Sequence, residues 1–257
     1  MLVGYYLEDW RAAGVKLPLR IFLEITPSIL LVGKSGSGKS LSTLWYIHNA
    51  LSKCESSIYI ADFKGGKEYV AFRDTDIYAN GDKAIEMIRK FYEYYLLIRS
   101  GEKKLEQHMT IVVEEWFGLL AYLDLKDKAV KKELMLKIGE ILALGRGLGI
   151  GCWLCVQRAS AELFPQGSRE QFQIILSYGR ISKEQRTMLF AGEDIDVSRN
   201  YSAGQGLVLI DGQQSGVQEI IVPYIRNQEV LCQRIREYLL TQKSLDVLCH
   251  DAAAGSG

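Results

Sequence analysis

The chain has 257 residues, which allows one large α/β domain or two small ones. Hydrophobic residues make up 48% and charged residues 24%, as in an average soluble protein, and a total of 4 prolines argues against a disordered chain. The 31 basic residues balance 31 acidic ones, so the formal net charge is zero. Proteins that bind nucleic acid by bulk attraction are basic, so any nucleic-acid partner requires locally concentrated charge.

The first residues and the cysteines favour a cytoplasmic protein. The start of the chain carries Glu8 and Asp9 and lacks the basic segment of a signal peptide. The longest uncharged apolar stretches have about ten residues, half of what a membrane span needs. An odd count of 5 cysteines suits a reducing compartment. Cys152 and Cys155 form a CxxC pair in a predicted buried strand, which favours a structural role over the alternative of a metal or redox site.

Strand-like and helix-like segments alternate along the chain. Apolar β-branched runs predict strands, and apolar residues spaced three and four apart predict helices. The predicted strands are residues 29–32, 57–61, 110–113, 151–156, 174–177, 207–210 and 217–222, and the predicted helices are 41–51, 82–99, 126–144, 183–190 and 228–240. Such alternation predicts an α/β fold with a mostly parallel central sheet, helices on both faces and a C-terminal β-hairpin around the turn at 211–216.

Three parts follow from this pattern. Residues 1–27 form an N-terminal extension, residues 28–241 form the main domain, and residues 242–257 form a C-terminal tail. The last six residues are small and linker-like, so we expect the tail to be flexible. Residues 100–107 are polar and predict a loop.

Residues 33–40 match the phosphate-binding pattern GxxxxGK[ST] at every fixed position, between a predicted strand and a predicted helix. Glycines let successive backbone N–H groups point at phosphate oxygens, and the helix contributes its positive end. We expect Lys39 to bridge the β- and γ-phosphates of ATP and Ser40 to bind Mg²⁺. The predicted nucleotide-binding residues are Gly33, Lys34, Ser35, Gly36, Ser37, Gly38, Lys39, Ser40 and Leu41.

Two carboxylates end the apolar strand at 110–113. In a P-loop enzyme the first acid of such a pair holds the metal shell and the second deprotonates the attacking water. Adjacent residues at a strand end suit these two tasks because their side chains point in different directions. We therefore predict Glu114 as the metal-side acid and Glu115 as the general base, with a solvated strand end as the alternative.

Two further residues are candidates for catalysis. Gln157 follows a predicted buried strand and suits a sensor of the γ-phosphate or the lytic water, although a simple turn residue is the alternative. Arg146 lies between glycines after a helix, where it is expected to be exposed and suits an arginine finger for a neighbouring subunit. Its alternative is an arginine that interacts with the helix dipole. Arg180 and Arg186 are weaker finger candidates.

From about Ser28 to Leu240 the chain resembles the motor domain of FtsK/SpoIIIE-type DNA translocases, in the FtsK–HerA branch of RecA-like ATPases. The resemblance depends on an ordered set of segments. These are the strand at 29–32 leading into GKSGSGKS, Asp62-Phe63-Lys64 after the second strand, Val112-Val113-Glu114-Glu115, the segments 142–150 and 155–158, the segment 181–189, and Gly204-Gln205-Gly206-Leu207. Two positions depart from the family: Glu114 replaces an Asp and Ala159 replaces a Pro.

This resemblance implies a RecA-like motor domain over residues 28–241 that acts as a hexameric ring. Such a ring hydrolyses ATP at subunit interfaces and threads double-stranded DNA through its centre. It also implies arginines that act in trans, for which Arg146 is the best match. Small stand-alone members of this branch occur in mobile elements, which implies a role in plasmid or transposon transfer, as in conjugation.

Candidate DNA contacts are sparse. Residues 126–137 contain five basic residues, Lys126, Lys128, Lys131, Lys132 and Lys137, on a helix whose alternative role is a solvated face. Loops 63–67 and 166–169 are further candidates, and none of the histidines is predicted to be catalytic or a metal ligand. Two other functions stay open: an FtsK-like ATPase for polypeptide export, as in type VII secretion systems, and a nucleotide-binding assembly module.

Overall fold

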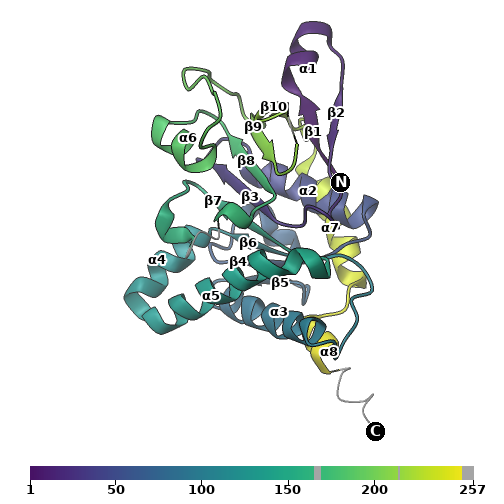
Figure 1. The fold of residues 1–257 in the computed structure, drawn as a ribbon. Coiled ribbons are helices and arrows are strands. Elements are labelled where there is room, and N and C mark those ends of the chain that lie inside the picture. The colour runs from purple at the N-terminus through teal and green to yellow at the C-terminus, as the bar shows by residue number, and fades with distance from the viewer. Residues whose placement is uncertain (165–168, 214, 251–257) are drawn as a thin grey trace.

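A computed structural model describes residues 1–164, 169–213 and 215–250 of the chain. Its strands are β1 (Leu2–Tyr6), β2 (Pro18–Arg20), β3 (Ile29–Gly33), β4 (Ser57–Asp62), β5 (Tyr78–Asn80), β6 (Met109–Glu114), β7 (Ile150–Val156), β8 (Ile174–Tyr178), β9 (Gln205–Ile210) and β10 (Gln218–Ile221). They form one ten-stranded sheet in the order β2-β1-β10-β9-β8-β3-β7-β6-β4-β5 (Figure 1).

Eight α-helices and three 3₁₀ turns are found in the described residues. The helices are α1 (Leu7–Ala13), α2 (Lys39–Lys53), α3 (Lys83–Arg99), α4 (Trp116–Lys126), α5 (Lys128–Leu144), α6 (Lys183–Leu189), α7 (Gln228–Thr241) and α8 (Leu245–His250). The turns are η1 (Lys67–Phe72), η2 (Gly145–Leu148) and η3 (Ala161–Leu163). In the part of the chain that is described, no helix combines the length and the apolar character needed to cross a membrane.

The strands from β8 to β5 in this order run parallel to one another. Every residue of β3, β6, β7 and β8 is buried, so side chains on both faces of these strands are covered. Helices α2 and α7 pack against each other, and α3, α4 and α5 form a second group (Figure 1). The predicted α/β class with a mostly parallel sheet is confirmed.

The other end of the sheet is antiparallel. β9 pairs with β8 and β10 in the predicted C-terminal hairpin. The N-terminal residues, predicted as an extension, join the same sheet because Tyr5 and Tyr6 of β1 pair with Ile221 and Ile220 of β10. β1, α1 and β2 project beyond the other strands at the top of Figure 1. Residues 1–27 are therefore structurally continuous with the main sheet.

The predicted helix at 126–144 is wrong in its first two residues. Helix α4 ends at Lys126, and Asp127 has extended backbone angles before α5 begins. The Asp127 carboxylate accepts hydrogen bonds from the N–H groups of Ala129 and Val130, and so caps α5. An aspartate that caps a new helix interrupts a pattern that periodicity alone reads as continuous.

Residues 242–250, predicted as part of a tail, pack against the edge of the sheet. The Gln242 side chain exchanges two hydrogen bonds with the backbone of Ile58, and the Tyr59 hydroxyl donates to the carbonyl of Lys243. Helix α8 then contacts α3. Residues 251–257 lie outside the described part of the chain.

The CxxC cysteines are buried free thiols in β7, and burial raises the pKa of both Cys152 and Cys155. The described residues contain no group of three or more His, Cys, Asp or Glu placed to hold a metal ion. Burial of both thiols in β7 is consistent with a structural role.

The close approach of β7 to the segment before β3 gives a stability prediction. A Cβ at Gly151 would lie 2.2 Å from the carbonyl oxygen of Pro27, whereas a Cβ at Gly147 would meet no atom within 4 Å. We expect Gly151→Ala to lower the free energy of unfolding by about 3 kcal/mol, because the backbone of a central strand has to move. Urea unfolding checks this against Gly147→Ala, which should change stability little; equal effects of the two variants would contradict the packing.

Candidate nucleotide-binding site

The loop from Gly33 to Gly38 connects β3 to α2 and is braced by the segment before β9. Gly38 has a φ of 88°, and its Cβ would lie 2.5 Å from the nitrogen of Gly204. The Gly204 N–H donates to the carbonyl of Ser37 at 2.9 Å. Glycine is required at position 38 for both reasons: the left-handed backbone and the close neighbour.

A cavity opens beside this loop. It is lined by Gly33, Lys34, Ser35, Gly36, Gly38, Lys39, Ser40, Leu41, Lys64, Glu68, Glu115, Gln157 and Ala203. The structure thus brings together all of the predicted nucleotide-binding residues except Ser37, along with the predicted general base and sensor. Ser37 lines an adjoining cavity that also contains Arg180.

These groups converge because parallel strands end at the same edge of a sheet. Asp62 at the end of β4 pairs with Glu114 at the end of β6, and Gly33 at the end of β3 pairs with Tyr178 of β8. The segment after β7 places Gln157 at the same edge.

Lys39 and Glu114 form a buried ion pair behind the cavity. The Lys39 Nζ lies 3.3 Å from the Glu114 Oε2, and the two side chains are 8% and 6% exposed. Burial is the largest single influence on the pKa of Lys39 and lowers it, but the charge and hydrogen bond of Glu114, with a smaller contribution from Glu115, together hold that pKa above its ordinary value. The lysine is therefore charged and paired in this structure.

The other oxygen of Glu114 is held by a tyrosine that sequence reasoning missed. Tyr69 lies in turn η1, and its hydroxyl donates a hydrogen bond of 2.6 Å to the Glu114 Oε1. Burial, followed by the charge of Glu114, raises the pKa of Tyr69, so this hydroxyl stays a donor. Tyr69 belongs to no recognisable motif, and no spacing in the sequence links it to Glu114.

Glu115, the residue directly before α4, has a left-handed conformation with φ 57° and ψ 43°. Such angles are strained for a residue with a side chain, and strain of this kind gathers at functional sites. Gln157 donates from its Nε2 to both carboxylate oxygens of Glu115 at 3.2 Å. Gly118 makes room for this side chain, because a Cβ there would lie 3.0 Å from the Glu115 Cγ.

Asp62 organises the loop on the far side of Glu114. Its carboxylate accepts hydrogen bonds from the N–H groups of Gly65 and Gly66 and from the Tyr78 hydroxyl. Burial is the main cause that raises the pKa of Asp62. The same loop directs Lys64 to the lining of the nucleotide cavity. Loop 63–67 is predicted as a DNA contact; the structure places its Lys64 beside the predicted nucleotide-binding residues, and contact with DNA stays a prediction.

The side chains present fit a magnesium ion. Ser40 lines the cavity, Glu114 offers a carboxylate at the end of β6, and both are the oxygen groups that Mg²⁺ prefers. The buried Ser37 Oγ of the same loop has no hydrogen-bond partner among the described residues. Ser40 and Glu114 would hold the ion.

Arg146 lies away from this cavity. It is exposed in η2, and its Nη1 lies 3.5 Å from the Asp211 Oδ2 after β9. Turn η2 directly precedes β7, and Asp211 follows Ile210, which pairs with the first residue of β8. Arg146 and Asp211 therefore lie at the edge of the sheet opposite the P-loop. The structure therefore does not bring Arg146 to the site of its own chain. Arg186, one of the weaker finger candidates, donates a hydrogen bond to the backbone carbonyl of Ile195.

The predicted basic helix is partly neutralised. Three of its five lysines form ion pairs: Lys126 with Asp82, Lys131 with Asp124, and Lys137 with Glu133. Lys128 and Lys132 are exposed and make no ion pair within the described residues. Residues 166–168 of the other predicted loop lie outside the described part of the chain. DNA contact by these segments stays a prediction.

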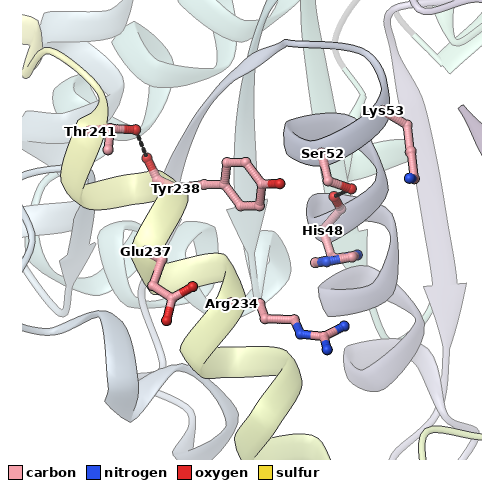
Figure 2. Close-up of a pocket in the computed structure, with 7 residues that line it drawn as sticks. All are labelled: His48, Ser52, Lys53, Arg234, Glu237, Tyr238 and Thr241. Carbon is pink, nitrogen blue, oxygen red and sulfur yellow. Dashed lines mark hydrogen bonds between the residues drawn. The ribbon is translucent and has the colours of Figure 1, made fainter.

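A second groove lies between α2 and α7, apart from the P-loop (Figure 2). It is lined by His48, Ser52, Lys53, Arg234, Glu237, Tyr238 and Thr241. The rings of His48 and Tyr238 meet edge-on with centroids 6.5 Å apart. Burial first, and then the nearby Arg234 and Lys53, lowers the pKa of His48. None of the predicted nucleotide-binding residues lines this groove.

No family model and no curated protein matches the chain. Several solved structures, in contrast, are similar to it. EssC (ATPases 2 and 3) from Geobacillus thermodenitrificans is 14% identical with a TM-score of 0.65 over 98% of this chain and 49% of that one. The pCW3 conjugation coupling protein TcpA with ATPγS is 18% identical with a TM-score of 0.66 over 92% of this chain and 69% of that one.

The genome packaging NTPase B204 of Sulfolobus turreted icosahedral virus 2 with AMPPCP is 18% identical with a TM-score of 0.55, over 77% of this chain and 98% of that one. The chain thus spans about half of EssC and nearly all of B204. These similarities confirm the RecA-like P-loop ATPase fold that the sequence resemblance predicts.

The buried ion pair gives a prediction for the protein without nucleotide. Lys39→Met should lower the free energy of unfolding by about 3 kcal/mol, because it leaves the buried Glu114 charge without its partner. Adding Glu114→Gln should recover part of that loss, since no charge then stays buried. Urea unfolding of both single variants and the double variant gives the coupling energy; additive effects would contradict the ion pair.

Proposed function

We propose that this chain is an ATP-hydrolysing motor of the FtsK–HerA type that moves DNA through a ring of subunits. The observation that carries the proposal is the convergence of Lys39, Ser40, Glu114, Glu115 and Gln157 on one edge of the sheet beside the P-loop. Each of these groups has a distinct task in phosphoryl transfer to water.

Binding of ATP uses the backbone of the P-loop and the first turn of α2. The N–H groups of the loop and the positive end of α2 attract the phosphates. Lys39 reaches the β- and γ-phosphates after its Nζ leaves Glu114, because one ammonium group cannot hold both at full strength. Bound Mg²⁺ neutralises charge on the phosphates, and Ser40 and Glu114 are the residues that would hold it.

Hydrolysis uses Glu115 as the base. Water attacks the γ-phosphorus, the bond from that phosphorus to the bridging oxygen of ADP breaks, and Glu115 accepts the proton of the water. Gln157, which already donates to both oxygens of Glu115, orients the carboxylate and then the water. The products are ADP and phosphate.

The position of Arg146 supports the proposed ring. This exposed arginine lies at the edge of the sheet opposite the P-loop of its own chain, as a residue that acts on a neighbour's nucleotide should. An arginine of this kind contributes about 10³–10⁵ in turnover. The resemblance to FtsK-type motor domains supports a hexameric ring in the cytoplasm.

Double-stranded DNA is the proposed cargo. The sequence resemblance to DNA translocases supports it, as do the similar folds of a conjugation coupling protein and a genome packaging NTPase. Transfer of a plasmid or another mobile element is the proposed process.

Polypeptide export is the second candidate. The folds of EssC and of EccC, a type VII secretion ATPase, are also similar to this chain, with TM-scores of 0.65. The ion pairs that neutralise three lysines of the predicted DNA-binding helix favour this alternative over a strongly basic DNA channel.

The role of Glu115 is tested by Glu115→Gln. Loss of the general base should lower the ATPase rate by about 100-fold or more, while the affinity for ATPγS stays within about threefold because the P-loop is intact. The exposed Glu162→Gln serves as the control and should leave both unchanged. A Glu115→Gln protein that hydrolyses ATP at the wild-type rate would contradict the assignment.

The cargo is tested by the ATPase rate at low salt with duplex DNA, single-stranded DNA or no DNA. Duplex DNA should raise the rate severalfold, and the stimulation should fall as salt rises because phosphate contacts release counterions. Lys128→Ala with Lys132→Ala should weaken the stimulation without changing the basal rate. A rate that duplex DNA leaves unchanged would reject a DNA motor and favour polypeptide export.

A further inference from the structure

The metal-side acid of this site is a glutamate, which has one more rotatable bond than the aspartate of the family that the chain resembles. A longer carboxylate needs additional contacts to stay in one position, because each free rotamer costs entropy when it is fixed. We propose that Tyr69 is the positioning residue that holds Glu114 for the magnesium–nucleotide complex. This inference rests on the proposed function of the site.

The two oxygens of Glu114 have separate donors. Oε2 receives the Lys39 ammonium at 3.3 Å, and Oε1 receives the Tyr69 hydroxyl at 2.6 Å. The Cys155 thiol is a further polar neighbour of Glu114, but a thiol is a weak donor. Tyr69 thus makes the shorter of the two strong contacts.

Binding of nucleotide changes this balance. When Lys39 moves to the phosphates, Glu114 loses its cationic partner while it stays buried behind the cavity. A buried carboxylate without donors is costly. Tyr69 is the strong donor that stays in place among the described residues, so it fixes the carboxylate at the moment when the metal needs it.

The surroundings of Tyr69 suit a fixed donor. Its ring stacks on Tyr78 with centroids 6.2 Å apart and an interplanar angle of 16°. The Tyr78 hydroxyl in turn donates to Asp62, the sheet neighbour of Glu114. Two stacked tyrosines therefore hold two adjacent carboxylates, one each.

Helix α7 holds the turn that carries Tyr69. The Cys232 thiol lies 3.5 Å from the carbonyl of Glu68, and Arg236 forms a two-point ion pair with Asp74 just after η1. The same helix packs on α2, which begins at Lys39 (Figure 2). Both strong donors of Glu114 are thus supported by elements that α7 contacts.

The test measures Mg²⁺ dependence of nucleotide binding in Tyr69→Phe. ATPγS affinity is measured in EDTA and across a magnesium titration. The magnesium concentration at half-effect should rise about tenfold, the loss expected for one hydrogen bond to a charged group, while affinity in EDTA changes less than about twofold because Tyr69 does not line the cavity beside the P-loop. Tyr59→Phe is the matched control: it removes another buried hydroxyl, which donates to Lys243, and should leave the magnesium titration unchanged.

A second variant keeps the test decisive if Tyr69→Phe does not fold. Glu114→Asp withdraws the carboxylate from Tyr69 and should also raise the magnesium requirement, and Tyr69→Phe should add little in the Glu114→Asp background. A magnesium titration equal to wild type in Tyr69→Phe, or a lower requirement in Glu114→Asp, would overturn the assignment of Tyr69. A wild-type protein whose ATPγS binding ignores magnesium would instead overturn the proposed function itself.

Discussion

The buried ion pair between Lys39 and Glu114 is the contact on which the rest of the site depends. The two opposite charges are removed from water together. Each buried charge is stable only while the other charge, or a ligand in its place, compensates it. In the proposed mechanism the phosphates compete for the lysine, and the carboxylate would then be free to hold the metal. The pair would therefore connect the occupancy of the P-loop to the acid at the end of β6, and we propose that Tyr69 keeps that acid in position during the exchange.

The parallel sheet makes this exchange possible. Because β3, β4, β6 and β7 end at one edge, residues far apart in sequence share a single cavity, and Glu115, the proposed general base, has a strained backbone and accepts hydrogen bonds from Gln157. Arg146 lies at the other edge, which agrees with its proposed action on the nucleotide of a neighbouring chain. A zero net charge is compatible with a DNA-moving ring only when cationic groups concentrate on one surface. The ion pairs of Lys126, Lys131 and Lys137 reduce the positive charge that the predicted helix contributes to such a surface.

Sequence patterns predict the parts of this arrangement that depend on local rules. The P-loop, the acid pair, Gln157, most helix and strand positions and the fold class follow from spacing and periodicity, and the resemblance names the ATPase family. The break at Asp127 was missed because a cap overrides periodicity. Tyr69, Gly118 and the pairing of β1 with β10 were missed because contacts between distant residues leave no mark in spacing. Loop 63–67 was linked to DNA through its charge, and its position beside the P-loop comes from the strand order.

The most direct test of this account is an experimental structure with magnesium and a non-hydrolysable ATP analogue. The account predicts that the Lys39 Nζ has moved from Glu114 to hydrogen-bonding distance of the phosphate oxygens, while the Tyr69 hydroxyl still donates to the Glu114 Oε1. A structure with nucleotide bound in the P-loop and Lys39 still paired to Glu114 would contradict it.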